Sequence, residues 1–147
     1  MTTACRNYDT RLRDLERDVH HLKTAHQRRR FFPALGASPN LIASQLIAIA
    51  ARAYGVSIIE VRGRTRSTAV AKARYAAIWL IYHHLDLSTK QIGRAFDRDH
   101  STVIHALQTT RRRFDERSGP DREILHDLAR QAAGLVEVLR SELNRNE

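Results

Sequence analysis

Helix-capping residues recur along this sequence at short intervals and divide it into a series of short helices. In a capping box, a Ser or Thr hydroxyl accepts a hydrogen bond from the backbone three residues on, and a Glu or Gln there reaches back. Ser57 with Glu60 and Ser88 with Gln91 fit this pattern, and Ser38 before a proline opens another helix. No stretch alternates apolar and polar residues as a strand does. We therefore predict an all-α fold.

Apolar residues recur on one face of each predicted helix. The predicted helices span residues 39–54, 58–62, 67–85, 88–96, 99–116 and 121–143. Gly55 and Gly119 mark breaks between them. The residues of the fifth helix expected to point inward are Val103, Ile104, Ala106 and Leu107. At the end of the third helix, His83 and His84 occupy positions where a cation is favoured.

The first 40 residues follow a different pattern. Five apolar side chains in residues 1–30 alternate spacings of four and three, as in a heptad seam: Tyr8, Leu12, Leu15, Val19 and Leu22. This seam fits a short coiled coil that forms a homodimer, and it fits equally an amphipathic helix packed on its own domain. Residues 31–40 look like a linker, in which Phe31 and Phe32 have no assigned role.

Positive charge is concentrated in the middle of the chain. The formal net charge is +9, and Arg supplies 22 of the 25 basic residues. Residues 41–117 hold 13 basic and 6 acidic side chains, whereas residues 118–147 hold 4 and 6. A small basic protein usually binds a polyanion, and the planar fork of Arg suits phosphates and guanine edges. We therefore expect a DNA-binding domain over 41–117, followed by a C-terminal helix over 118–147.

Other classes of function find little support. Cys5 is the single cysteine, the first ten residues lack the apolar segment of a signal peptide, and the longest apolar stretch, 46–51, is too short to span a bilayer. The histidines lack the spacing of a zinc site, and no catalytic set can be assembled. We expect a cytoplasmic, nucleoid-associated protein that is not an enzyme, with no metal, cofactor or membrane contact.

Two predicted helices, 88–96 and 99–113, follow one another across a tight turn, which is the layout of a helix-turn-helix. In such a pair the second helix places its N-terminal turn in the major groove. Asp99 is expected to cap that helix. Asp99 can also accept from a cytosine amino group, while His100, Ser101 and Thr102 can contact bases or phosphate. The same residues also fit caps on a solvent-facing helix end.

The run RDHSTVIHA at residues 98–106 resembles the signature of the C-terminal DNA-binding domain of the bacterial replication initiator DnaA. Residues 56–74 are similar to the short helix, basic loop and following helix of that family. Gln91, Ile92, Gly93 and Phe96 match the helix before the signature. The resemblance covers about residues 41–113, and it implies a DnaA-type helix-turn-helix without the ATPase module, because no G-x-x-x-x-G-K-[ST] loop is present.

The resemblance implies a role for each matching residue. Asp99, His100 and Ser101 match major-groove contacts, and Arg66 matches the basic-loop arginine that enters the minor groove. The residues that would lie on phosphate are Arg62, Arg64, Arg74, Lys90 and Thr102, of which Lys90 occupies a position where the family has proline. Two further departures bear on these roles. The family has two glycines before the signature Arg, where this chain has only Asp97, so the turn must be tighter or the first helix must end earlier. Tyr82 replaces a basic residue.

Two functions remain open at this point. The first is sequence-specific binding of double-stranded DNA at initiator-type boxes, which would modulate replication initiation or transcription. The alternative is an adaptor that binds the replication initiator or its regulators without contacting DNA. The shorter turn, the negative charge of Asp97 and the two terminal helices favour the alternative.

Overall fold

The computed structural model describes residues 37–145, and every regular element in that range is a helix. The helices are α3 (Ala37–Ala53), α4 (Ile58–Arg62), α5 (Thr68–His84), α6 (Thr89–Phe96), α7 (His100–Phe114) and α8 (Pro120–Arg145). The predicted all-α class is confirmed, and each predicted boundary lies within about two residues of the observed one. The heptad seam, and with it the question of a homodimer, lies outside the described residues, as does most of the predicted linker.

The predicted caps explain where the short helices begin. Ser57 and Ser88 each accept a hydrogen bond from the backbone three residues on, and Glu60 and Gln91 complete the two capping boxes. Ser67 accepts from the backbone N–H of Val70 and starts α5. These caps fix the entry to α4, α5 and α6, and so they also fix the loop before α5.

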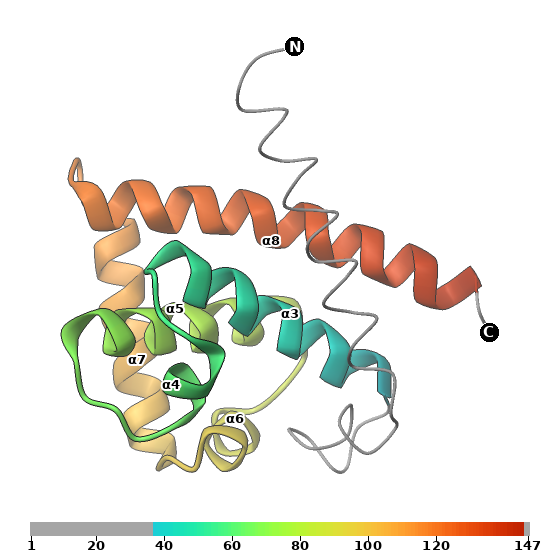
Figure 1. Cartoon of the computed structure of the whole chain (residues 1–147), viewed down its shortest axis with the longest axis horizontal. Coiled ribbons are helices and arrows are strands. Elements are labelled where there is room, and N and C mark those ends of the chain that lie inside the picture. Colours follow the sequence, from blue (N-terminus) through green and yellow to red (C-terminus); the bar gives the residue numbers. More distant parts are fainter. Residues whose placement is uncertain (1–36, 146–147) are drawn as a thin grey trace.

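The described helices share one hydrophobic core. α3 packs against α5 and α8, while α7 packs against α5, α6 and α8 (Figure 1). Leu46, Ile78 and Ile81 are fully or almost fully buried at its centre. α8 adds Leu125, Leu128, Leu135 and Leu139 to the same cluster. The C-terminal helix that the sequence marked off at 118–147 therefore belongs to the core of the domain.

Polar contacts hold α8 in place along its length. The Lys72 ammonium lies 3.1 Å from an Asp121 carboxylate oxygen, and a guanidinium nitrogen of Arg140 donates to the His84 carbonyl. The ring of His126 stacks on Phe114 with centroids 3.9 Å apart. α7 is thereby fastened to α8 at its C-terminal end, and its N-terminal end lies on the opposite side of the molecule beside α6 (Figure 1).

The prediction that Ile104 points inward was wrong. Its side chain is 39% exposed, whereas Val103 and Ala106 are fully buried. His100, Ser101 and His105 are exposed too. With 3.6 residues per turn, these positions share the outer face of α7 with Ile104, and α5, α6 and α8 cover the other face.

The expectation that His83 and His84 favour a positive charge is also reversed. Burial lowers the pKa of both rings; Arg111 lowers that of His83 further, as Arg140 and His83 do for His84. A lowered pKa in the folded state means that the unfolded chain binds more protons than the folded chain below about pH 6.5. The folded state therefore becomes less stable relative to the unfolded state as the pH falls.

We expect the melting temperature to drop on going from pH 7.5 to 5.5, and to drop about 1–3 °C less in the double variant His83→Gln, His84→Gln. Both rings are only partly buried, which keeps the effect small. Thermal unfolding followed by circular dichroism at the two pH values measures it. An equal drop in both proteins would contradict the assignment to these rings.

Candidate nucleic-acid interface

The turn between α6 and α7 is three residues long and is closed by one residue in a left-handed conformation. Asp97 adopts φ 52° and ψ 51°, and it is the one non-glycine residue with positive φ in the described part of the chain. The backbone N–H of Arg98 donates to the Gly93 carbonyl at 2.8 Å. Asp97 thus adopts the left-handed conformation that glycine usually adopts at the end of a helix, so the turn needs no glycine.

Gly93 lets α6 lie directly against this turn. A Cβ atom at this position would lie 2.5 Å from the carbonyl oxygen of Arg98 and 3.5 Å from the backbone nitrogen of His100. Both neighbours are backbone atoms, which cannot rotate away as a side chain can. Only glycine at position 93 allows the two helices to meet at this distance.

The first turn of α7 presents polar side chains to solvent. Asp99, His100 and Ser101 are exposed and Thr102 is half-buried. Asp99 is the N-cap residue, as predicted, but its side chain makes no capping hydrogen bond. The backbone N–H groups of Thr102 and Val103 donate to the Asp99 carbonyl, so the exposed Asp99 carboxylate is not engaged by the helix that it precedes.

The basic loop runs from the end of α4 to the N-cap of α5, over residues 63–67. Arg66 is exposed, and its side chain has no hydrogen bond or ion pair among residues 37–145. Arg64 forms an ion pair with Asp97, in which both side chains are about four-fifths exposed (78% and 81%). Arg62 is half-buried. The loop therefore lies beside the turn of the helix-turn-helix, with Arg66 directed to solvent.

Arg74 is almost fully buried and makes its hydrogen bonds to the protein's own backbone. Its side chain is 7% exposed and projects from α5 beneath the basic loop. Nε donates to the Val61 carbonyl at 2.8 Å. Nη2 donates to three further carbonyls, those of Glu60, Gly63 and Thr65, at 2.9–3.1 Å. Burial and the nearby Arg98 lower the pKa of Arg74. The phosphate contact expected of Arg74 stays a prediction; in this structure the guanidinium shapes the loop.

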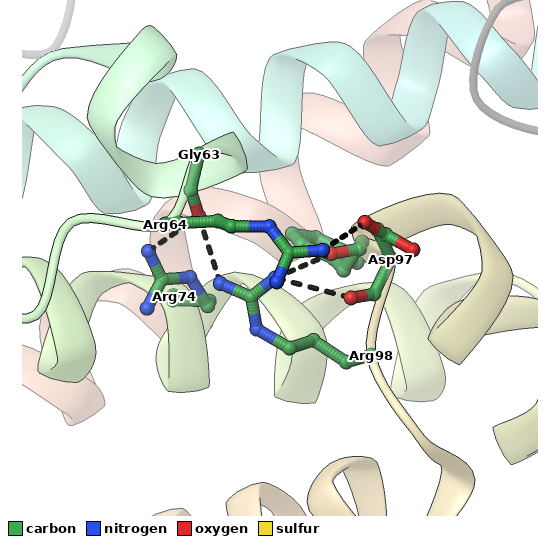
Figure 2. A network of polar contacts seen from close by, with 6 residues as sticks. Gly63, Arg64, Arg74, Asp97 and Arg98 are labelled. Atoms are coloured by element: carbon green, nitrogen blue, oxygen red, sulfur yellow. Dashed lines mark hydrogen bonds and ion pairs between the residues drawn. The ribbon is translucent and has the colours of Figure 1, made fainter.

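Arg98 connects the loop and the turn, a role that was not assigned from the sequence. Its Nη1 donates to the carbonyls of Phe96 and Asp97 at 3.0 and 3.1 Å, and its Nη2 donates to the carbonyl of Gly63 at 2.8 Å (Figure 2). The available signal was its place as the first residue of the matching signature. The structure thus brings together the two halves of the predicted site, the loop and the first turn of α7.

Lys90 lies apart from this network, in the first turn of α6. Its side chain is exposed and has no partner among the described residues, and the same is true of Arg94 on the same helix. Metal binding has no visible basis in this part of the chain, since no three His, Cys, Asp or Glu side chains of residues 37–145 cluster. None of the described helices is long and apolar enough to cross a membrane.

Two helices joined by a three-residue turn, with a polar first turn beside a basic loop, define a helix-turn-helix domain. Residues 43–109 match the family model described as the bacterial dnaA protein helix-turn-helix. Through this segment, the chain belongs to that family.

Individual relatives agree with this assignment. The chain is 36% identical over 104 residues to chromosomal replication initiator protein DnaA 1 of Chlamydia trachomatis, covering 71% of this chain and 22% of the relative. It is 28% identical over 123 residues to DnaA of Mycobacteroides abscessus, covering 70% and 25%. The chain therefore spans about a quarter of the length of these relatives.

Proposed function

We propose that this protein binds double-stranded DNA in a sequence-dependent way at initiator-type boxes, and so modulates replication initiation or transcription. The observation that supports this most strongly is the exposed first turn of α7, where Asp99, His100 and Ser101 project to solvent next to the loop that carries Arg66. Such a protein would act at the nucleoid.

The chemistry of these side chains suits adjacent grooves of one duplex. A carboxylate such as that of Asp99 accepts from a cytosine amino group, and the imidazole of His100 can bond a base edge. An arginine on a flexible loop enters a narrow, A/T-rich minor groove, where the negative potential is greatest. Arg98 and Asp97 bind the loop to the turn, and this supports a contact of Arg66 with the same duplex as the first turn of α7.

Phosphate contacts would fix the register of the complex. Thr102 lies at the N-terminal end of α7, where backbone N–H groups favour an anion. Arg62 ends α4, Arg64 lies on the loop and Lys90 lies on α6, where they would contact phosphates on either side of the major-groove helix. Arg64 must exchange the Asp97 carboxylate for a phosphate to do so.

The variants Arg66→Ala and His100→Ala test this proposal. Each is expected to cost about 1–3 kcal/mol in binding to the preferred box, and to flatten selectivity at the positions it contacts. The preferred box is obtained by selecting bound duplexes from a random pool at two salt concentrations, and affinities follow from gel shifts. Arg117→Ala is the matched control, because it removes one exposed charge beyond the other end of α7.

Undiminished binding by both variants would refute the proposal. If the wild-type chain shifted no duplex, but retained the replication initiator in a pull-down after nuclease treatment, the adaptor function would replace it. The negative charge of Asp97 beside the candidate DNA surface is the observation that favours the adaptor function.

A further inference from the structure

We propose that Arg98 is a positioning residue that couples the basic loop to the recognition helix α7, so that minor-groove discrimination by Arg66 depends on the turn of the helix-turn-helix. This inference rests on the proposed DNA-binding function. It concerns a residue that itself contacts backbone carbonyls of the protein, and it predicts that the two halves of the site act as one unit.

The coupling is carried by a single half-buried guanidinium. Arg98 bonds the carbonyls of Phe96 and Asp97 in its own turn and the carbonyl of Gly63, which lies 35 residues earlier in the chain (Figure 2). The Gly63 oxygen also accepts from Arg74 at 2.9 Å, so two cations converge on one loop carbonyl. Arg74 of α5 and Arg98 of the turn therefore both hold the loop.

The side chain of Arg66 makes no polar contact that fixes its direction. It lies three residues beyond Gly63, and it has no hydrogen-bonding partner in the described structure. The path of the loop backbone, which Arg74 also holds at the Thr65 carbonyl, therefore determines where the Arg66 side chain projects. Without the Arg98 contact, Arg74 would still hold the loop, but only the exposed Arg64–Asp97 pair would join it to the turn before α7. The loop would then have to be ordered against α7 when DNA binds.

A second contact between the same segments serves as the control. Arg64 and Asp97 join the loop to the turn as well, but both side chains are about four-fifths exposed, and exposed ion pairs contribute little. Asp97→Asn removes this pair and leaves the carbonyls that Arg98 binds. Asn also tolerates the left-handed conformation of position 97.

The test uses Arg98→Lys in the full chain. Lysine keeps the charge but lacks the planar fork that spans two segments. Binding is measured on the selected box and on duplexes substituted at each position, for wild type, Arg98→Lys, Arg66→Ala, the double variant and Asp97→Asn. Arg98→Lys should reduce affinity about 3–10-fold and flatten the positions that Arg66→Ala flattens. The positions that His100→Ala flattens should keep their preference.

The double variant should bind within about twofold of Arg66→Ala alone, because the second substitution removes an effect that needs Arg66. Asp97→Asn should leave discrimination at those positions unchanged. Fully additive effects, or equal flattening at the His100-dependent positions, would overturn the proposal.

A measurement without DNA separates this inference from the proposed function. Backbone order parameters of residues 64–66 are measured by ¹⁵N relaxation of the free full chain. In Arg98→Lys they should fall from the rigid value of about 0.85 toward about 0.6, while those of α7 stay unchanged. Unchanged order in the loop would refute the coupling whether or not the protein binds DNA. If Arg98→Lys does not fold, Arg98→Gln is measured instead, with the same expected fall in loop order.

Discussion

Replacing Gly93 by alanine should lower the free energy of unfolding by about 1–3 kcal/mol and remove binding to the preferred DNA box. The added methyl group would lie 2.5 Å from the Arg98 carbonyl oxygen. Since no side-chain rotation relieves a clash with backbone, α6 and α7 must move apart, and with them the first turn of α7. Urea denaturation measures the loss of stability, and a gel shift with the selected box measures the loss of binding.

Gly55→Ala is the matched control for this variant. Gly55 has φ +67°, and an added Cβ would meet nothing within 4 Å, so this substitution adds strain in the backbone without a collision. We expect a cost of about 1 kcal/mol and unchanged DNA binding, because position 55 follows α3. Equal effects of the two substitutions on DNA binding would contradict the role assigned to Gly93.

Arg74→Lys should destabilise the free protein by about 2–3 kcal/mol, because a lysine cannot reproduce the Nε and Nη2 hydrogen bonds to four carbonyls and leaves the buried Val61 carbonyl without a partner. A residue that served only to contact phosphate would change stability by no more than about 0.5 kcal/mol when replaced by lysine. Urea denaturation without DNA therefore distinguishes the two roles.

The comparison variant for Arg74 is Arg94→Lys, in which the original side chain is exposed and has no partner among residues 37–145. It should unfold as the wild type does. If Arg74→Lys were equally stable and only weakened binding to all duplexes alike, Arg74 would be a phosphate contact after all.

The architecture could be predicted because its signals are local. A capping box needs only residues three apart, so Ser57 with Glu60 and Ser88 with Gln91 located α4 and α6 within a residue or two. The helix-turn-helix followed from two such helices in series. The apolar spacing of α8 was also visible, but its packing in the same core as α3 was not, because spacing shows that a face is buried and not which element covers it.

The site was harder to predict, because the roles of its arginines depend on contacts distant in sequence. Arg66 and Arg74 look alike in the sequence, yet Arg66 is exposed with no partner among residues 37–145 and Arg74 is 7% exposed beneath the loop. Arg98 reaches a carbonyl 35 residues away. The empty cap at Asp99 was missed for a related reason: position makes a residue an N-cap, and only the rotamer decides whether its oxygen bonds the helix.

The docking of α8 leaves only the N-terminal end of α7 exposed for a duplex. α7 starts beside α6 and the basic loop and finishes against α8 (Figure 1). A duplex bound at that N-terminal turn would therefore occupy the one exposed end of this helix, so each domain would hold one box and two boxes would need two copies of it.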